Sequence, residues 1–254
     1  MTLPGNNRPG DNRKTRQIML ALTLVLSSFL LPTTGLADTP LTPFEAAYDT
    51  RALGMSMSLS RKLELEGDTY TLSSFGKNML LTLSERSSFT IENGQVLGQQ
   101  FKSESKALKT QRRAVNFDQS AGVIDSMKQG KWTQHEWQLG LLDRFSQQQQ
   151  IRLTLLGADT PPDQLAFTVV DGPKISEKIW ERVEADPIDT PLGRLDVVSY
   201  REVHDNPKKR ASRIWLAPEL QYLMVKTEHI ERSSKIRVNI ESLDWLDSFA
   251  DWQE

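Results

Sequence analysis

Alternation of apolar and polar residues between positions 55 and 65 constrains the fold of this chain more than any other feature of its sequence. Side chains at every second position of a β-strand point to the same face, so the pattern predicts a strand with one buried and one solvated face. A single charged residue, Arg61, interrupts the apolar set. The other members of that set are Met55, Met57, Leu59, Leu63 and Leu65.

Similar strand patterns recur along the chain, with turn residues between them. Residues 66–69 and 92–95 contain the Gly and Asn that tight hairpin connections need. We therefore predict a β-meander from position 43 to roughly 138, followed by a second set of strands to roughly 243. An antiparallel sheet this long has to curl, because a flat one leaves long exposed edges. The predicted fold class is mainly β, a strongly curved antiparallel sheet or open β-barrel.

Between the two sets of strands, the sequence favours one short central helix. Gln, Leu and Arg dominate positions 141–155, and β-branched residues are scarce there. We expect roughly one to three helical turns in this region, lying against or inside the concave side of the sheet. Asp143 is expected to accept hydrogen bonds from the first amide groups of the helix, and a catalytic carboxylate is the alternative role.

The N-terminal residues have the organisation of an export leader. Residues 18–31 carry no charge, follow three basic residues, and precede small residues at positions 35 and 37. The uncharged stretch is shorter than the roughly 20 residues that cross a bilayer. We expect a signal peptide over residues 1–37, a polar lead-in over residues 38–42 and a single β-rich domain over residues 43–254. The alternative, a retained membrane anchor, is disfavoured by Pro32.

Composition narrows the environment and the partners. The chain has no cysteine, which excludes disulfides, thiolate metal ligands and lipid attachment through cysteine. Without residues 1–37 the chain keeps 27 basic and 32 acidic residues, a formal charge of −5. This balance argues against a nucleic-acid partner. We expect a periplasmic protein whose mature chain has no transmembrane segment.

Two groups of residues are candidates for binding. The mouth of a curved sheet can hold an apolar ligand, and the alternative is that the same side chains fill the interior. The residues predicted to line such a site are Met55, Met57, Leu59 and Trp215. A basic stretch is predicted to form an exposed strand face or loop that could contact anionic material such as lipid phosphate. It consists of Lys102, Lys106, Lys109, Arg112 and Arg113.

No motif indicates catalysis or a metal. His135, His204 and His229 lie far apart in the sequence and lack the spacing of a zinc site. The Gly-flanked turn that exposes a nucleophilic serine is also missing from the sequence. We therefore predict no catalytic residue, no metal and no cofactor.

Several short motifs in the C-terminal half carry a resemblance to a known family. They are the TPLG motif at residues 190–193, the IWLAP motif at 214–218, the EL pair at 219–220 and the YLMVK motif at 222–226. Together with residues 43–48 and 142–146, they make the chain similar to the bacterial exported family called domain of unknown function 3108 (DUF3108). The chain departs from the family pattern at Met224, where proline is commoner. The resemblance implies an envelope location and a β-rich fold, and it implies no established reaction.

The leading hypothesis is a non-enzymatic protein that binds or carries an apolar or amphiphilic component of the cell envelope. The alternative is a scaffold or interaction module that contacts an envelope protein or polymer. An enzyme acting on envelope polysaccharide ranks last, because no group of residues supplies a nucleophile or an acid and base.

Overall fold

Antiparallel pairing of consecutive strands organises the first half of the chain. The structure is a computed structural model, and it describes residues 41–52, 54–206, 210–231 and 234–246. The expected leader over residues 1–37 and the first three residues of the expected lead-in lie outside the described residues. Within the described part, no helix has the length and apolar character that spanning a membrane requires.

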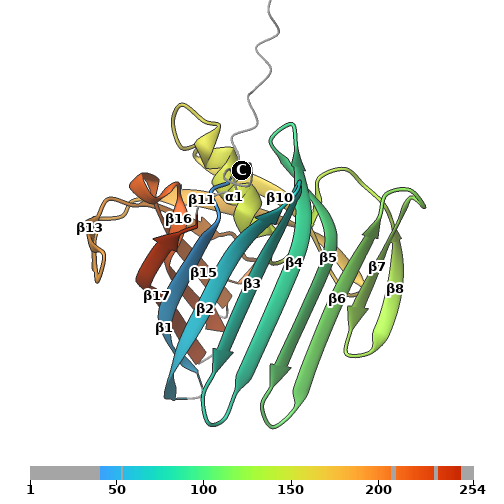
Figure 1. The fold of residues 1–254 in the computed structure, drawn as a ribbon, viewed down its shortest axis with the longest axis horizontal. Helices are drawn as coiled ribbons and strands as arrows, with labels where there is room; N and C mark the ends of the chain where they lie inside the picture. Colours follow the sequence, from blue (N-terminus) through green and yellow to red (C-terminus); the bar gives the residue numbers. More distant parts are fainter. Residues whose placement is uncertain (1–40, 53, 207–209, 232–233, 247–254) are drawn as a thin grey trace, which may run out of the picture. The chain divides into compact units, whose positions relative to one another are not determined.

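Eight strands form the predicted meander, each paired with the one before it (Figure 1). Asn93 and Gly94 both have positive φ, +51° and +72°, at the predicted turn between the fourth and fifth strands. That backbone shape suits a two-residue hairpin, and Asn and Gly adopt it readily. The strands are β1 (Phe44–Ala52), β2 (Met55–Glu66), β3 (Thr69–Lys77), β4 (Thr82–Glu92), β5 (Gln95–Lys106), β6 (Thr110–Asp118), β7 (Val123–Lys128) and β8 (Lys131–Glu136).

The second half extends the same sheet from its other side, because β1 also pairs with the last strand, β17. The order of strands in the described sheet is β8-β7-β6-β5-β4-β3-β2-β1-β17-β16-β15-β14-β11-β10-β9. A separate hairpin is formed by β12 (Ile188–Thr190) and β13 (Gly193–Leu195), and Pro218–Leu220 is a short 3-10 helix. The remaining strands are β9 (Leu141–Asp143), β10 (Gln164–Asp171), β11 (Lys174–Val183), β14 (Val198–Glu202), β15 (Arg210–Ala217), β16 (Leu223–Glu231) and β17 (Ser234–Trp245).

These strands confirm the predicted class, a mainly β fold with a large curved sheet and one α-helix in the described part. One detail of the prediction is wrong. Residues 141–143 were expected to be helical, and they form β9, which runs parallel to β10. The physical reason is burial on all sides: Leu141, Leu142 and Asp143 are each at most 3% exposed, so pairing with β10 satisfies their backbone.

The sheet curls until its late strands face its early ones, and side chains rather than backbone ladders join them. We call this set of contacts the seam. In the seam, the Ser87 hydroxyl of β4 donates to the Asp143 carboxylate of β9 at 2.8 Å. Arg113 of β6 pairs with Asp171 of β10 at 3.0 Å. The ring of His135 in β8 lies 2.9 Å from the carbonyl oxygen of Gly172.

The helix α1 (Gln147–Leu156) lies within the curl, at the end where β4 turns into β5 (Figure 1). The Gln150 side chain fixes it there: it accepts a hydrogen bond from the Val96 amide at 2.7 Å and donates one to the Gly94 carbonyl at 3.1 Å. The helix is buried on more than one face, unlike a surface helix with one apolar stripe. Its buried residues are Gln147, Gln149, Ile151, Arg152, Leu153 and Leu155.

Candidate functional site

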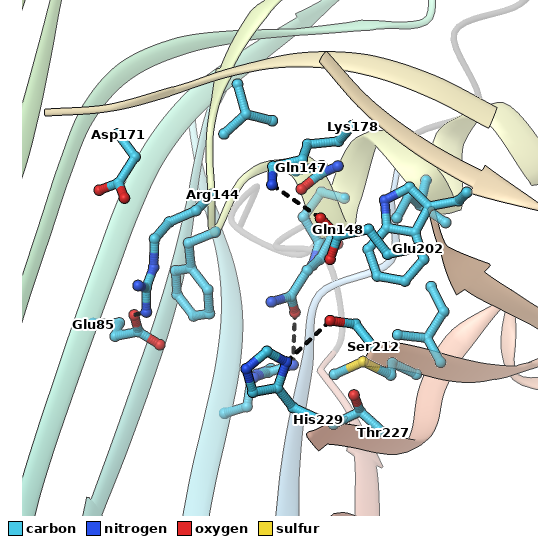
Figure 2. Close-up of a pocket in the computed structure, with 18 of the residues that line it drawn as sticks. Glu85, Arg144, Gln147, Gln148, Asp171, Lys178, Glu202, Ser212, Thr227 and His229 are labelled. Carbon is cyan, nitrogen blue, oxygen red and sulfur yellow. Dashed lines mark hydrogen bonds and ion pairs between the residues drawn. The ribbon is translucent and has the colours of Figure 1, made fainter. Parts of the chain in front are cut away.

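A cavity of about 870 Å³ lies between α1 and the strands that surround it. This volume falls within the roughly 300–1,000 Å³ that small-molecule sites occupy. Figure 2 shows Glu85 and Arg144 on one side of the cavity, Glu202 and Ser212 on the other, and Gln148 of α1 between them. Its apolar lining includes Val169, Ile151, Ile214, Leu216, Leu223 and Met224.

Cationic side chains outnumber carboxylates around this cavity by eight to four, although the whole chain carries a formal charge of −2. The excess therefore reflects a local concentration of positive charge. The cationic residues are Arg61, Arg113, Lys128, Arg144, Arg152, Lys174, Lys178 and Arg210. The carboxylates are Glu85, Asp171, Glu202 and Glu231.

Some of these cations have a carboxylate partner. Arg144 contacts Glu85 at 2.7 Å, and Lys178 contacts Glu202 at 2.9 Å (Figure 2). Asp171 accepts from Arg113 and also lies 3.7 Å from Lys128. These pairs neutralise part of the wall without any ligand.

Arg61 is different, because within the described chain it has no carboxylate within ion-pair distance. It projects from β2 and is 8% exposed. Its Nη1 donates to the Oε1 atom of Gln148 at 2.8 Å. Its guanidinium carbon lies 5.4 Å from the ring centres of both Tyr48 and Phe145. Neutral amide and aromatic groups thus surround this charge.

Arg152 of α1 repeats the arrangement with even less exposure, 2%. Its Nη1 donates to Gln149 at 2.9 Å, its Nε donates to the Gln221 carbonyl at 3.2 Å, and it lies 5.3 Å from the Phe44 ring centre. Burial lowers the pKa of Arg152 to about 10, so the group stays charged at neutral pH. In the described chain, Arg152 too has no carboxylate within ion-pair distance.

The charges of Arg61 and Arg152 both influence Tyr48. Burial raises the pKa of Tyr48, and the guanidinium groups of Arg61 and Arg152 both oppose that rise. Moving an ion from water into the protein interior costs several kcal/mol of free energy, and only a well-placed opposite charge offsets that cost. A cation–π contact returns about 0.5–2 kcal/mol. The aromatic rings therefore offset only part of the cost.

Unpartnered hydrogen-bond donors gather at the same cavity. Among the described residues, five buried side-chain nitrogen or oxygen atoms have no hydrogen-bond partner within the chain. Four of them are N–H donors on residues that line the cavity. These four are Arg61 Nε, Gln147 Nε2, Arg152 Nη2 and Trp180 Nε1. A site rich in free donors and cations can bind an anion.

A second polar group lies on the wall formed by β15 and β16. The Ser212 hydroxyl lies 3.0 Å from Nδ1 of His229 (Figure 2). It also lies 3.4 Å from Nε2 of His204. His204 lies 3.3 Å from Glu202. Burial lowers the pKa of His204, which favours the neutral ring. The two histidines that are distant in the sequence thus share one serine, although no group of three metal-ligating side chains occurs among the described residues.

The residues predicted to line a ligand site do not line this cavity. Met57 and Leu59 are each 5% exposed and belong to the core, where both lie over Gly76 of β3. Met55, in the same strand, is half-buried. Met57 and Leu59 therefore fill the interior, which was the alternative to lining a ligand site.

Trp215 also lies elsewhere, because it projects from the face of β15 opposite Ile214 and Leu216. It is 6% exposed and belongs to the main core cluster. Arg213 and Lys226 stack on its ring at 4.5 Å and 4.6 Å. Trp215 therefore packs in the core, on a face of β15 that does not line the cavity.

The predicted basic stretch is divided by the strand geometry. Only Arg113 reaches the large cavity. Lys106 and Arg112 both pair with Glu104, at 2.7 Å and 2.6 Å, and Lys109 is exposed in a bend. Lys102, Arg112 and Arg113 line a second hollow, together with Met127 and Trp132. Lys106 and Lys109 line neither this hollow nor the large cavity, so the five residues do not share one surface.

Asp143 was expected to accept hydrogen bonds from the first amides of the helix, but the amides that it binds lie before the helix, which begins at Gln147. Its Oδ1 accepts hydrogen bonds from the amides of Phe145 and Ser146, at 2.7 Å and 2.9 Å. Burial raises the pKa of this carboxyl, against the effect of its hydrogen bonds. It does not line the large cavity, and its two amide bonds fix the chain between β9 and α1.

Taken together, the fold and the cavity define a class: a β-rich protein whose single curved sheet encloses a ligand-sized, cationic cavity. The profile of the family described as "Protein of unknown function (DUF3108)" matches residues 45–238. The chain belongs to this family, as the sequence motifs indicated.

A solved structure has the same fold. It is the crystal structure of the beta-barrel-like protein of domain of unknown function DUF1849 from Brucella abortus. The similarity has a TM-score of 0.54 and covers 82% of this chain and 99% of that one, with 10% sequence identity. At this identity the likeness concerns the fold alone. No curated protein matches the sequence.

Proposed function

We propose that this protein is exported to the periplasm and binds an amphiphilic component of the cell envelope in the cavity beside α1, without chemical turnover. The observation that carries the proposal is the cavity itself, about 870 Å³ with both an apolar and a cationic lining. A wholly apolar ligand would leave the charged groups without partners, and a wholly polar one would leave the apolar wall wet. An amphiphile satisfies both parts of the lining.

Export is proposed on the leader-like sequence over residues 1–37 and the lack of cysteine. Fractionation of cells that express the full chain tests it. The shortened chain is expected in the periplasmic fraction. Recovery of the full-length chain in the cytoplasm would contradict this part of the proposal.

Binding without turnover is proposed because of where Ser212 lies. Ser212 contacts His229, and His229 in turn lies 3.8 Å from Glu231. Ser212, however, sits within the regular strand β15, whose backbone pairs with β14 and β16. Acyl transfer needs amide N–H groups that point at the developing oxyanion. The amides of a paired strand already donate hydrogen bonds to the neighbouring strands. The group is better suited to hydrogen-bonding a ligand.

The test is native mass spectrometry of the protein purified after expression of the full chain. A small amphiphile that organic solvent extracts is expected with the wild type. Thr227→Trp, which fills the cavity from β16, is expected to lose it. Glu228→Trp, the next residue on the same strand, is the matched control and should keep it. Failure of the wild type to carry or take up any amphiphile would overturn the proposal.

A second candidate function, contact with an envelope protein or polymer, is favoured by the second hollow on β5–β8. Trp132 is 55% exposed there, beside Lys102, Arg112 and Met127. Exposed aromatic and basic side chains together are typical of interaction surfaces. Crosslinking in cells through position 132 tests this candidate. A reproducible crosslinked partner would support it, and crosslinking to no partner would contradict it.

A further inference from the structure

We propose that Arg61 and Arg152 bind the anionic head of the ligand, a carboxylate or a phosphate group. The inference rests on the proposed function and adds the chemical class of the ligand to it. It assigns the recognition of charge to two residues on different elements, β2 and α1.

The charges of Arg61 and Arg152 have no counter-ion in the described chain. Both residues are more than nine-tenths buried, and neither has a carboxylate within ion-pair distance there. The other arginines of the cavity wall show that the fold can supply such partners: Arg144 has Glu85, and Arg113 has Asp171. Water can satisfy free N–H groups, but it does not neutralise a charge. An anion in the cavity would do so.

The two arginines come from different elements and reach the same cavity. Arg61 and Arg152 are held by successive residues of one helix, since Gln148 accepts from Arg61 and Gln149 accepts from Arg152. Both guanidinium groups also lie close enough to Tyr48 to influence its ionisation. Arg61 from β2 and Arg152 from α1 thus line one cavity and both lie near Tyr48. Two forked guanidinium groups suit the several oxygens of a carboxylate or phosphate.

Hydrogen-bond donors at this cavity also lack partners within the described chain. Each arginine has one buried nitrogen without a partner, and so does Gln147 of α1. All three line the cavity. An ionised oxygen acid accepts such bonds and donates none, so it matches this set better than a neutral amide or hydroxyl group.

The experiment compares probes that share an acyl chain and differ in the head. Palmitate carries a carboxylate, palmitoyl lysophosphatidic acid carries a phosphate, and monopalmitoyl glycerol is neutral. Inorganic phosphate alone is the fourth probe. Affinities are measured by titration calorimetry on the purified protein after solvent extraction of any bound amphiphile and refolding. We expect at least one charged amphiphile to bind more than about tenfold tighter than the neutral one, the scale of a lost charged hydrogen bond.

The variants test which residues cause that preference. Arg61→Met and Arg152→Met are each expected to reduce the preference to less than about threefold and to leave the neutral probe nearly unaffected. Arg61→Lys keeps the charge and loses the fork, so it should show an intermediate preference. Arg213→Met is the matched control. It removes another arginine stacked on an aromatic ring, that of Trp215, which does not line the cavity, and should leave the preference unchanged.

The outcomes separate this inference from the proposed function. Binding of neutral and charged amphiphiles with equal affinity overturns the anionic head and leaves the cavity function standing. Arg-dependent binding of inorganic phosphate, with no gain from an acyl chain, supports the anion site and overturns the amphiphile. Binding of no probe by the wild type overturns both. If one methionine variant fails to fold, by circular dichroism, the lysine variant and the other methionine variant decide the result.

Discussion

Asp143→Ala should destabilise the fold because one buried carboxylate holds three donors. The amides of Phe145 and Ser146 and the hydroxyl of Ser87 all donate to it, at 2.7, 2.9 and 2.8 Å. Each lost bond that leaves a buried donor costs at least about 1 kcal/mol, so the expected loss is about 3 kcal/mol. With a urea m-value of about 2 kcal/mol per molar, the unfolding midpoint should fall by about 1.5 M.

The control is Asp143→Asn, which keeps the shape and one acceptor oxygen and should cost less than about 1 kcal/mol at pH 7. Burial raises the pKa of Asp143 in the folded chain, so the ionised form opposes folding. Stability from this group therefore rises as the pH falls through the folded pKa, and the asparagine variant lacks this rise. A midpoint for Asp143→Ala within about 0.3 M of the wild type, equivalent to about 0.6 kcal/mol, would refute the reasoning.

Three further predictions concern other parts of the fold. Gly172→Ala should lower the free energy of unfolding by about 1–3 kcal/mol, measured in urea. The reason is that φ at Gly172 is +60° and the new Cβ would lie 2.7 Å from the Cβ of Lys128. An unchanged unfolding midpoint would count against this prediction. Trp215→Ala should cost about 3–5 kcal/mol by the same assay, since a buried ring leaves a cavity, and a loss below about 1 kcal/mol would show that Trp215 is not core. Burial lowers the pKa of His204, so the unfolded chain takes up a proton at higher pH than the folded one, and stability falls as the pH drops below about 6.5. His204→Gln should lose less stability than the wild type between pH 7 and pH 5, and equal losses would exclude this cause.

Strand positions were predictable because they depend on neighbours in the sequence. Alternation in β2 indicated which side chains point inward, and the Asn93-Gly94 pair indicated a hairpin. Residue composition misassigned β9 as helical, because Leu and Arg favour a helix and three residues are too few to show the period of a strand. Their pairing with β10 depends on the tertiary fold.

The site was largely beyond prediction because its members meet across the curl. Arg61 was visible as the one charge on an apolar face, a signal that could have identified it, but it was not among the predicted site residues. Its partner Gln148 lies 87 positions away, so no local pattern connects them. The same holds for Ser212 and His229, on adjacent strands but 17 positions apart. Apolar alternation identified core residues such as Met57, and it does not distinguish a packed interior from a ligand wall.

The seam distinguishes this sheet from a closed barrel. In a closed barrel, backbone hydrogen bonds join all strands, so the number and stagger of the strands fix the diameter. Here the wall meets itself through a few side chains such as Ser87, Asp143 and Arg113. A substitution at one of these contacts would leave the backbone pairing of every strand in place, so the width of the interior depends on side chains and not on the number of strands.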